Sequence, residues 1–251
     1  MAYLFTDLDN TLVFSHRHVT EAKQVCVERL NGKDQSFMTY KAYRFFAEQK
    51  ITEVIPVTTR SFAQYDRLAE LAAQMKWEKA LICNGAILLI NNREDEEWSA
   101  ESREISKQDI PMLKKLYSIA SENAGEEAVV NICDLMFYVK SNNSDKIFSA
   151  LSEAADSHIN VLRDSRKIYC IPASLNKGTA AERYISRFGK QFSVSAGDSL
   201  FDVPMFEKTD ICIYPKQLAV KNISGISCSG IFSDAICRQL ETLYKEGVLG
   251  G

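Results

Sequence analysis

Four aspartates form two pairs that lie far apart in the sequence, and each pair follows a short apolar run. The stretch YLFTDLDNTL places Asp7 two residues before Asp9, and the stretch FSVSAGDSLFD places Asp198 four residues before Asp202. Carboxylates that lie close together repel one another unless a cation or a proton offsets their charge. Hard oxygen ligands of this kind select Mg²⁺. If the fold brings the two pairs together, they predict a magnesium site.

The first pair also suits phosphoryl transfer. Asp7 could attack phosphorus as a carboxylate nucleophile and form an aspartyl-phosphate. Asp9 could serve as general acid to the leaving alcohol and then as general base to water. In this arrangement Asp198 completes the metal site with Asp7, and the backbone carbonyl of Asp9 is a third candidate ligand. Asp202 is expected to orient that site from outside the ligand set.

Groups that could hold a phosphate follow in two other stretches, VTTR and LNKG. The Thr58 hydroxyl, the backbone N–H of Thr59 and the Lys177 ammonium could stabilise the charge that develops on the phosphoryl oxygens. Arg60 could reach the substrate or pair with an acid at the surface, and both alternatives stay open. Asn84, which precedes a glycine, could form an ordinary turn or part of the pocket rim and contact the substrate.

An α/β core is needed to position these groups. Short apolar runs at 3–7, 53–59 and 80–85 predict buried strands, and apolar periodicity predicts helices at 36–49 and 61–76. Strands that alternate with helices form a parallel sheet with helices on both faces. Ligands bind at the carboxyl ends of the strands in such a sheet. We therefore expect the reactive groups at one rim of the sheet.

Between residues 86 and 172 the pattern changes to that of an α+β domain. Residues 86–100 predict a hairpin, and strands with one polar face follow it. Further helices are expected at 105–124, 144–158, 177–189 and 233–247, and further strands at 126–141, 159–164, 167–172, 192–196 and 211–215. We therefore predict a discontinuous α/β core at 1–85 and 173–251, interrupted by an α+β cap domain at 86–172.

The stretches DLDNTL, VTTR, LNKG and GDSLFD resemble, in this order, the four motifs of the haloacid-dehalogenase-like superfamily of phosphohydrolases. The position of the insert, between the second and third motifs, resembles the type-two capped branch. Its pattern is similar to the Cof-like and sucrose-phosphate-phosphatase-like subgroup. The resemblance implies a Rossmann-like parallel-sheet core. It also implies Mg²⁺-dependent hydrolysis of a phosphate ester through an aspartyl-phosphate, with the cap choosing the substrate.

Three positions depart from the pattern of this family. Asn10 replaces a common glycine, which is a mild change because asparagine tolerates unusual backbone angles. Thr59 stands where Cof-like members usually have glycine. Phe201 stands where many members have asparagine, so that a polar contact to the metal-site waters or the phosphate would be missing. Both acidic positions of the first motif are retained, which indicates an active enzyme.

Four other side chains have more than one interpretation. His16 and His18 follow the first motif and could bind a metal or lie near the leaving group, but a solvated loop is favoured. Trp98 and Tyr138 lie in the predicted cap and could line a sugar site. Aromatic residues more often pack against a sheet, and this interpretation is favoured for both.

The composition excludes several classes of protein. The 251 residues carry a net charge of -3 at pH 7, with 46% hydrophobic and 25% charged residues, and the charges are interspersed. This pattern gives no basic surface for nucleic acid or for a membrane. No apolar stretch is long enough to span a bilayer, and the N-terminus lacks a signal-peptide pattern. Seven cysteines without CxxC spacing indicate reduced thiols and a cytoplasmic protein.

We therefore expect a cytoplasmic, Mg²⁺-dependent phosphatase of small phosphorylated metabolites, first of all sugar phosphates. The first alternative is a phosphosugar mutase or phosphotransferase, which would pass the same aspartyl-phosphate to a second hydroxyl. The second alternative is a non-catalytic sensor of a phosphorylated ligand, which only Phe201 supports. Intact Asp9 disfavours the sensor and also a dehalogenase, because neither ligand binding nor halide release needs a proton donor.

Overall fold

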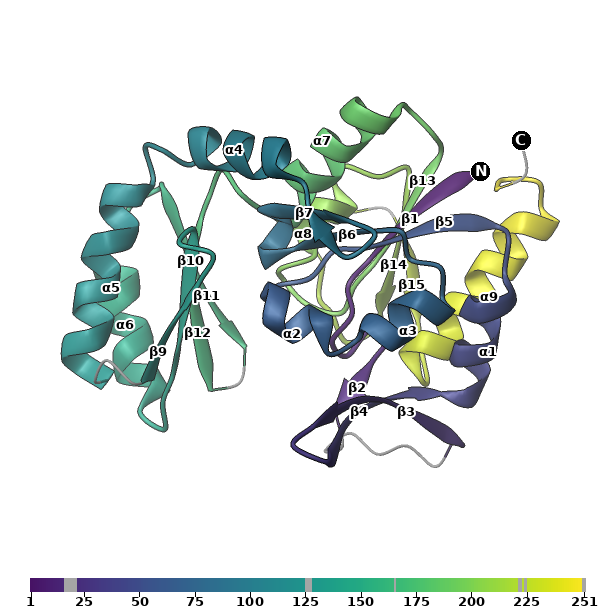
Figure 1. Cartoon of the computed structure of the whole chain (residues 1–251), viewed down its shortest axis with the longest axis horizontal. Helices are drawn as coiled ribbons and strands as arrows, with labels where there is room; N and C mark the ends of the chain where they lie inside the picture. The colour runs from purple at the N-terminus through teal and green to yellow at the C-terminus, as the bar shows by residue number, and fades with distance from the viewer. Residues whose placement is uncertain (16–21, 125–127, 165, 221–222, 224, 250–251) are drawn as a thin grey trace. The chain divides into compact units, whose positions relative to one another are not determined.

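The chain folds into two compact units. The computed structural model describes residues 1–15, 22–124, 128–164, 166–220, 223 and 225–249. The first unit consists of Met1–Glu94 and Lys177–Gly251, and the second of Asp95–Asn176 (Figure 1). The second unit is therefore inserted into the first at a single point. Its assignment as a substrate-selecting cap stays a prediction.

A five-stranded parallel sheet forms the centre of the first unit. Its strand order is β15-β14-β13-β1-β5, and every neighbouring pair is parallel. All residues of β1 are buried, as expected for a strand of a sheet that is covered on both faces. The five strands are β1 (Ala2–Thr6), β5 (Thr52–Pro56), β13 (Ser193–Ala196), β14 (Ile211–Pro215) and β15 (Ile226–Cys228). This arrangement confirms the predicted α/β fold class.

Helices flank this sheet. The ring of Tyr184 in α7 packs edge-on against Tyr3 and Phe5, which point to the same face of β1, with ring centroids 5.4 Å apart in each pair. Helix α9 packs against β14, β15 and α1. The helices of this unit are α1 (Tyr40–Glu48), α2 (Phe62–Asp66), α3 (Ala69–Gln74), α7 (Lys177–Phe188), α8 (Val203–Phe206) and α9 (Phe232–Lys245).

An antiparallel hairpin sheet follows the first motif and was not predicted. Its order is β2-β4-β3, with β2 (Phe14–Ser15), β3 (Gln24–Leu30) and β4 (Lys33–Thr39). The prediction of a helix from residue 36 was wrong for its first four residues, which belong to β4. The helix begins at Tyr40 because Thr39 caps it, accepting a hydrogen bond from the Ala42 N–H at 3.1 Å. The dipeptide Asn31-Gly32, with φ angles of 52° and 73°, forms the turn and could have identified the hairpin.

A second small sheet, β6-β7-β8, belongs to the first unit. Strand β6 (Lys79–Ile82) pairs with β7 (Ile87–Ile90), which pairs with β8 (Arg93–Glu94). This pairing holds residues 86–94 on the core side, so the units divide at Glu94 and Asp95 rather than at residue 86. Residues 96–100, predicted as a strand of the hairpin, form the start of helix α4 (Glu96–Ile105). Asp95 caps this helix by accepting from the Trp98 N–H at 2.8 Å.

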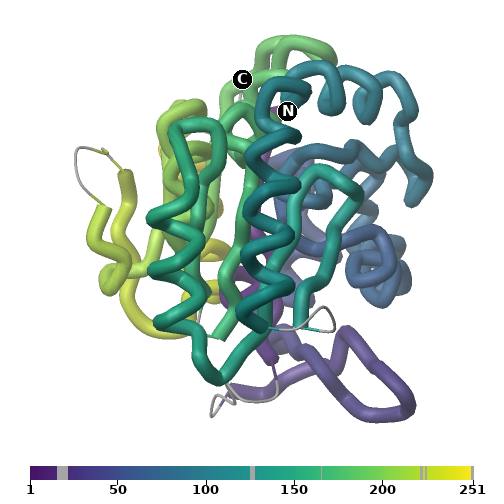
Figure 2. Tube along the Cα trace, turned by 90° about the vertical axis from the view of Figure 1, so that its left-hand side faces the viewer, coloured from purple at the N-terminus to yellow at the C-terminus, as the bar shows by residue number. Residues whose placement is uncertain are grey.

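The second unit is a four-stranded antiparallel sheet with helices. The strand order is β11-β12-β10-β9. Helices α5 and α6 lie side by side on one face of this sheet (Figure 2). Leu116 and Leu151 from the helices and Phe137 and Ile168 from the strands share one hydrophobic core. The remaining elements are β9 (Val129–Ile132), β10 (Met136–Lys140), β11 (Ile159–Asp164), β12 (Lys167–Pro172), α5 (Ile110–Ala124) and α6 (Ser144–Ala154).

The structure describes both aromatic residues singled out in this unit. Trp98 is 1% exposed. The ring of Tyr138 lies against that of Tyr169 on the neighbouring strand, with 5.4 Å between centroids, and the Lys167 ammonium lies over it at 4.9 Å. The burial of Trp98 and the ring contacts of Tyr138 support the packing interpretation.

We expect His158 to make the stability of the second unit depend on pH. Its Nδ1 lies 2.9 Å from Oδ1 of Asp109, and this hydrogen bond raises the pKa of His158 above its ordinary value of 6.5. Protonated His158 therefore stabilises the folded state below the unfolded pKa, and this contribution is lost as the pH rises through the raised pKa. We expect the difference in Tm between the natural chain and His158→Gln to be larger at about pH 6 than at about pH 9. Thermal unfolding of both proteins across this range checks it, and a difference independent of pH would contradict it.

Two further expectations concern the whole chain. Among the helices of the described residues, none is both long and apolar enough to cross a bilayer. All seven cysteines fall within the described residues, and each is a free thiol. The redox state of these thiols stays a prediction.

Candidate active site

The carboxyl ends of three adjacent strands carry the predicted site residues. Strand β1 lies between β13 and β5; Asp7 follows β1, Asp198 follows β13 and Thr58 follows β5. The strand pairing continues into this edge, where the Asp7 N–H donates to the Ala196 carbonyl at 2.9 Å. Because neighbouring parallel strands end at the same edge, side chains far apart in the sequence meet there.

Asp7, Asp198 and Asp202 form a cluster of carboxylates. One carboxylate oxygen from each lies within 4.8 Å of the others. Asp202 Oδ2 accepts hydrogen bonds from the backbone N–H groups of Asp198, at 3.1 Å, and Ser199, at 2.9 Å. Gly197 permits this approach, since a Cβ there would lie 2.3 Å from Cγ of Asp202. The loop after β13 therefore fixes Asp198 relative to the fully buried Asp202.

Lys177, the first residue of α7, lies between two of these carboxylates. Its Nζ donates to Oδ1 of Asp7 and to Oδ1 of Asp202, each at 2.6 Å, and its side chain is 2% exposed. Burial alone would lower the pKa of Lys177, but the charges of Asp202 and Asp7 raise it above its ordinary value. A Cβ at Gly178 would lie 2.2 Å from the Pro204 carbonyl oxygen, so only glycine allows the start of α7 to pack this closely on α8. Lys177 is therefore a fixed positive charge.

One ammonium does not balance three carboxylates. Burial raises the pKa of Asp7 well above its ordinary value; Lys177 opposes this effect, and Asp202 and Asp198 add to it. A divalent cation would offset the repulsion, and carboxylate oxygens are ligands that Mg²⁺ prefers. The residues at this rim therefore fit the magnesium that the sequence predicts. Asp202 is engaged by Lys177 and by backbone N–H groups, which suits an orienting role.

The Asp9 carboxylate forms a two-point ion pair with Arg60. Nε of Arg60 donates to Oδ2 at 2.8 Å, and Nη2 donates to Oδ1 at 2.7 Å. Arg60 is thus engaged by an acid of the site itself rather than by a surface acid. Asn10 adopts a φ of 60°, which confirms that asparagine provides the unusual angle of this loop. A role of the Asp9 carbonyl as a metal ligand stays a prediction.

Thr58 and Asn84 lie next to each other at the end of β5. The Thr58 hydroxyl accepts a hydrogen bond from the Arg60 backbone N–H at 3.2 Å. The backbone carbonyl of Thr58 accepts one from the Asn84 N–H at 2.8 Å. Asn84 is buried and has a φ of 59° in the short turn η1 (Cys83–Gly85). The turn is therefore part of the rim. Contacts of Thr58, Thr59 and Asn84 with a substrate stay predictions.

Three residues around the site were missed in the sequence. Thr11 Oγ1 donates to Oδ1 of Asp198 at 3.0 Å. Glu28 and Arg67 extend the ion pairs of Arg60, as described below. The turn signal of the hairpin could have indicated the position of Glu28, whereas no local pattern identifies Thr11 or Arg67. Of the remaining candidates, His16 and His18 lie outside the described residues, and Phe201 is buried with 9% exposure.

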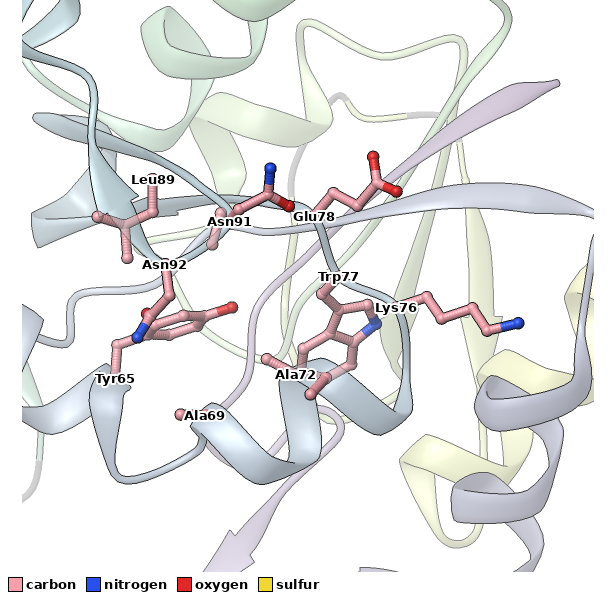
Figure 3. A pocket seen from close by; sticks show the side chains of 11 residues that line it. Tyr65, Ala69, Ala72, Lys76, Trp77, Glu78, Leu89, Asn91 and Asn92 are labelled. Carbon is pink, nitrogen blue, oxygen red and sulfur yellow. The ribbon is translucent and has the colours of Figure 1, made fainter.

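A pocket of about 360 Å³ lies elsewhere in the first unit. Figure 3 shows Tyr65 and Trp77 on opposite sides of it, with Ala69 and Ala72 below and Asn91 above. The Tyr65 hydroxyl is buried and has no hydrogen-bond partner among the described residues. None of the predicted site residues lines this pocket.

Comparisons with known proteins agree with this geometry. The family described as haloacid dehalogenase-like hydrolase matches residues 48–217, which is more than half of the chain. The chain therefore belongs to the haloacid dehalogenase-like hydrolase family. A search of curated sequences finds no match.

Solved structures share the whole fold at low sequence identity. The sucrose-phosphatase of Synechocystis sp. PCC6803, solved with sucrose and phosphate, has a TM-score of 0.61 at 17% identity, covering 97% of each chain. A subclass IIB sugar phosphatase of the same superfamily has a TM-score of 0.62 at 14% identity, covering 99% of this chain and 100% of that one. A trehalose-6-phosphate phosphatase related protein has a TM-score of 0.57 at 15% identity, covering 98% and 99%. These similarities show that the chain shares the fold of these proteins.

Proposed function

We propose that the protein is a Mg²⁺-dependent phosphatase of small phosphorylated metabolites, with sugar phosphates as its preferred substrates. The observation that carries this proposal is the buried Lys177, which bridges Asp7 and Asp202 at 2.6 Å beside Asp198. A nucleophile, a fixed cation and metal-binding carboxylates are what transfer of a phosphoryl group to a carboxylate requires. The sugar phosphatases among the structural neighbours support the substrate class.

In the first step, a carboxylate oxygen of Asp7 attacks phosphorus as the bond from phosphorus to the leaving oxygen breaks. Asp9 donates a proton to the leaving oxygen. Lys177 holds Oδ1 of Asp7, which orients the carboxylate and leaves Oδ2 for the attack. The Thr58 hydroxyl, the Thr59 N–H and Lys177 stabilise the charge on the phosphoryl oxygens.

In the second step, water attacks phosphorus, Asp9 takes its proton, and the bond from phosphorus to Asp7 breaks. Phosphate and free Asp7 result, so that the proton donated in the first step is recovered. Mg²⁺, held by Asp7, Asp198 and the Asp9 carbonyl, would supply positive charge that offsets the repulsion between carboxylate and phosphate. Asp202 keeps Lys177 and the Asp198 backbone in place.

Two other assignments belong to the same proposal. Asn84 is a candidate substrate contact because it is buried beside Thr58 at the rim. Arg60 is engaged by Asp9, which favours orientation of the acid over a direct substrate contact. We also propose a cytoplasmic location, which the seven free thiols favour.

The test is phosphate release from a panel of sugar phosphates, nucleotides and small phospho-acids, with Mg²⁺ and with a chelator. We expect release that requires Mg²⁺ and is fastest with a sugar phosphate. The sugar products are analysed in the same samples. Isomerised sugar phosphate without net release would replace the phosphatase with the mutase, and tight binding without turnover by folded, Mg²⁺-loaded protein would favour the sensor.

A further inference from the structure

Arg60 connects Asp9 to a carboxylate on the neighbouring hairpin. Its Nη2 donates both to Oδ1 of Asp9, at 2.7 Å, and to Oε2 of Glu28 on β3, at 3.0 Å. The other oxygen of Glu28 accepts from Nε of Arg67 at 2.7 Å, and the Ser36 hydroxyl on β4 donates to Oε2 at 2.5 Å. We call these five residues the Glu28 network. It joins the hairpin sheet, the end of β5 and the end of α2 to the predicted general acid.

Glu28, Arg60 and Ser36 are buried, whereas Asp9 and Arg67 are partly exposed. The side chains of Glu28 and Arg60 are 2% and 8% exposed, whereas that of Asp9 is 50% exposed. Burial disfavours ionised Glu28, but the Arg60 charge and the hydrogen bonds from Ser36, Arg60 and Arg67 lower the pKa of Glu28 below its ordinary value. Glu28 is therefore a charged group in a dry environment, where its contacts to Arg60 are strong and directional.

The Arg60 guanidinium has little freedom to turn. It uses Nε and Nη2 on the two oxygens of Asp9, and Nη1 donates to the Gln64 carbonyl at 3.2 Å. A planar guanidinium satisfies two carboxylates on different sides in one orientation only. Without the Glu28 charge, Arg60 would be anchored mainly by the half-exposed Asp9, and neither group would fix the direction of the other.

We propose that Glu28 is a positioning residue for proton transfer: acting through Arg60, it holds the Asp9 carboxylate in the direction from which Asp9 protonates the leaving oxygen. The proposal rests on the phosphatase function proposed above. In the acid step Asp9 carries its proton on one carboxyl oxygen and accepts from Arg60 on the other. The proton passes to the leaving oxygen as the phosphorus–oxygen bond breaks, and ionised Asp9 then accepts from Arg60 on both oxygens, as in the structure. Glu28 and Arg60 neither gain nor lose a proton. The hairpin thereby takes part in the acid step, although it lies outside the four motifs.

The test compares two leaving groups in Glu28→Gln, which keeps the shape of the side chain and removes its charge. Glucose 6-phosphate, or a better sugar phosphate from the panel, releases an alkoxide that must be protonated, whereas p-nitrophenolate leaves without a proton. We expect kcat/KM to fall about 10- to 100-fold for the sugar phosphate, as for other displaced catalytic groups. For p-nitrophenyl phosphate we expect a fall of less than about threefold, because kcat/KM reports only the steps up to the phosphoenzyme.

Two reference variants interpret the result. Glu53→Gln removes a carboxylate of the same unit that pairs with Lys79 and Tyr184, away from Asp9, and should leave both substrates unchanged. Asp9→Asn should show the same selectivity with a larger loss, about 10²- to 10⁴-fold for the sugar phosphate. If Glu28→Gln affects both substrates equally, or neither, while Asp9→Asn is selective, the positioning role is overturned and the phosphatase proposal stands.

Two further outcomes are distinguished. If Glu28→Gln does not fold, Ser36→Ala, which removes only one hydrogen bond to Oε2, replaces it and should show the same selectivity at smaller amplitude. Equal rates of the natural chain and Ser36→Ala on the sugar phosphate would then overturn the proposal. If the natural chain releases no phosphate from either substrate, the proposed function fails and the positioning role fails with it.

Discussion

Asp7→Asn should lower Mg²⁺-dependent phosphate release by about ten-thousand-fold or more, because an amide cannot attack phosphorus. We propose this role for Asp7 because it directly follows β1 and contacts the Lys177 ammonium at 2.6 Å. Among the described residues, the carboxylates of Asp7 and Asp202 are the ones that accept hydrogen bonds from Lys177, and Asp202 is fully buried. The measurement is the initial rate of phosphate release at saturating Mg²⁺, together with the mass of protein quenched during turnover.

The matched control is Asp210→Asn. Asp210 accepts hydrogen bonds from the N–H and hydroxyl of Ser193, the first residue of β13, and so lies at the opposite end of the sheet from Asp7. We expect this variant to keep nearly full activity and to form the phosphoenzyme. If Asp7→Asn kept more than about one hundredth of the natural rate, or carried a phosphoryl group after quenching, Asp7 could not be the nucleophile.

Lys177→Met should have the largest effect on stability. Lys177 is fully buried and is the ammonium shared by Asp7 and Asp202. Removing one partner of a buried ion pair typically costs about 3–5 kcal/mol, because the remaining charge is left without compensation. Part of this cost is absorbed when Asp7 takes up a proton, since burial already raises its pKa. The loss in the free energy of unfolding should therefore be larger near neutral pH than in mild acid.

Urea unfolding of Lys177→Met with and without Mg²⁺ measures this effect. We expect Mg²⁺ to stabilise the variant more than the natural chain, because the metal becomes the principal cation facing Asp7. Phosphate release should also be lost, since the oriented nucleophile and one phosphate ligand are gone. The control Lys79→Met removes a lysine that pairs with Glu53 near the surface, and it should change the free energy of unfolding by less than about 1 kcal/mol. A similar loss in both variants would show that Lys177 is an ordinary ion-pair partner.

The fold was largely predictable because its signals are local. Strand β1 is an apolar run that ends abruptly in acid, and an α/β sheet gathers the ends of such strands at one edge. This rule alone predicted that Asp7, Asp198 and Asp202 would meet, and the structure brings them together. Lys177 was recognised by its place in the third motif, and it lies at the start of α7, between two of these carboxylates.

The hairpin shows where local signals failed. Residues 36–39 continue the apolar pattern of α1, so that periodicity extended the predicted helix backward into β4. The actual boundary depends on the pairing of β4 with β3 and on the Thr39 cap, and strand pairing is a non-local interaction. At residues 96–100 the error was the reverse: a strand was predicted, but a helix capped by Asp95 begins directly after β8.

The class of fold, the acidic cluster and its fixed cation were predictable from the amino-acid sequence, because they follow from strand-end positions and residue types along the chain. The partners of Arg60 became known from the three-dimensional structure, since the sequence left them open between substrate and acid. Asp9, Glu28 and Gln64 reach this guanidinium from separate elements, and the choice among them depends on burial and on the direction of side chains. Burial strengthens the ion pair between Arg60 and Glu28. The sequence of β3 does not indicate which distant positive charge will pair with the Glu28 carboxylate.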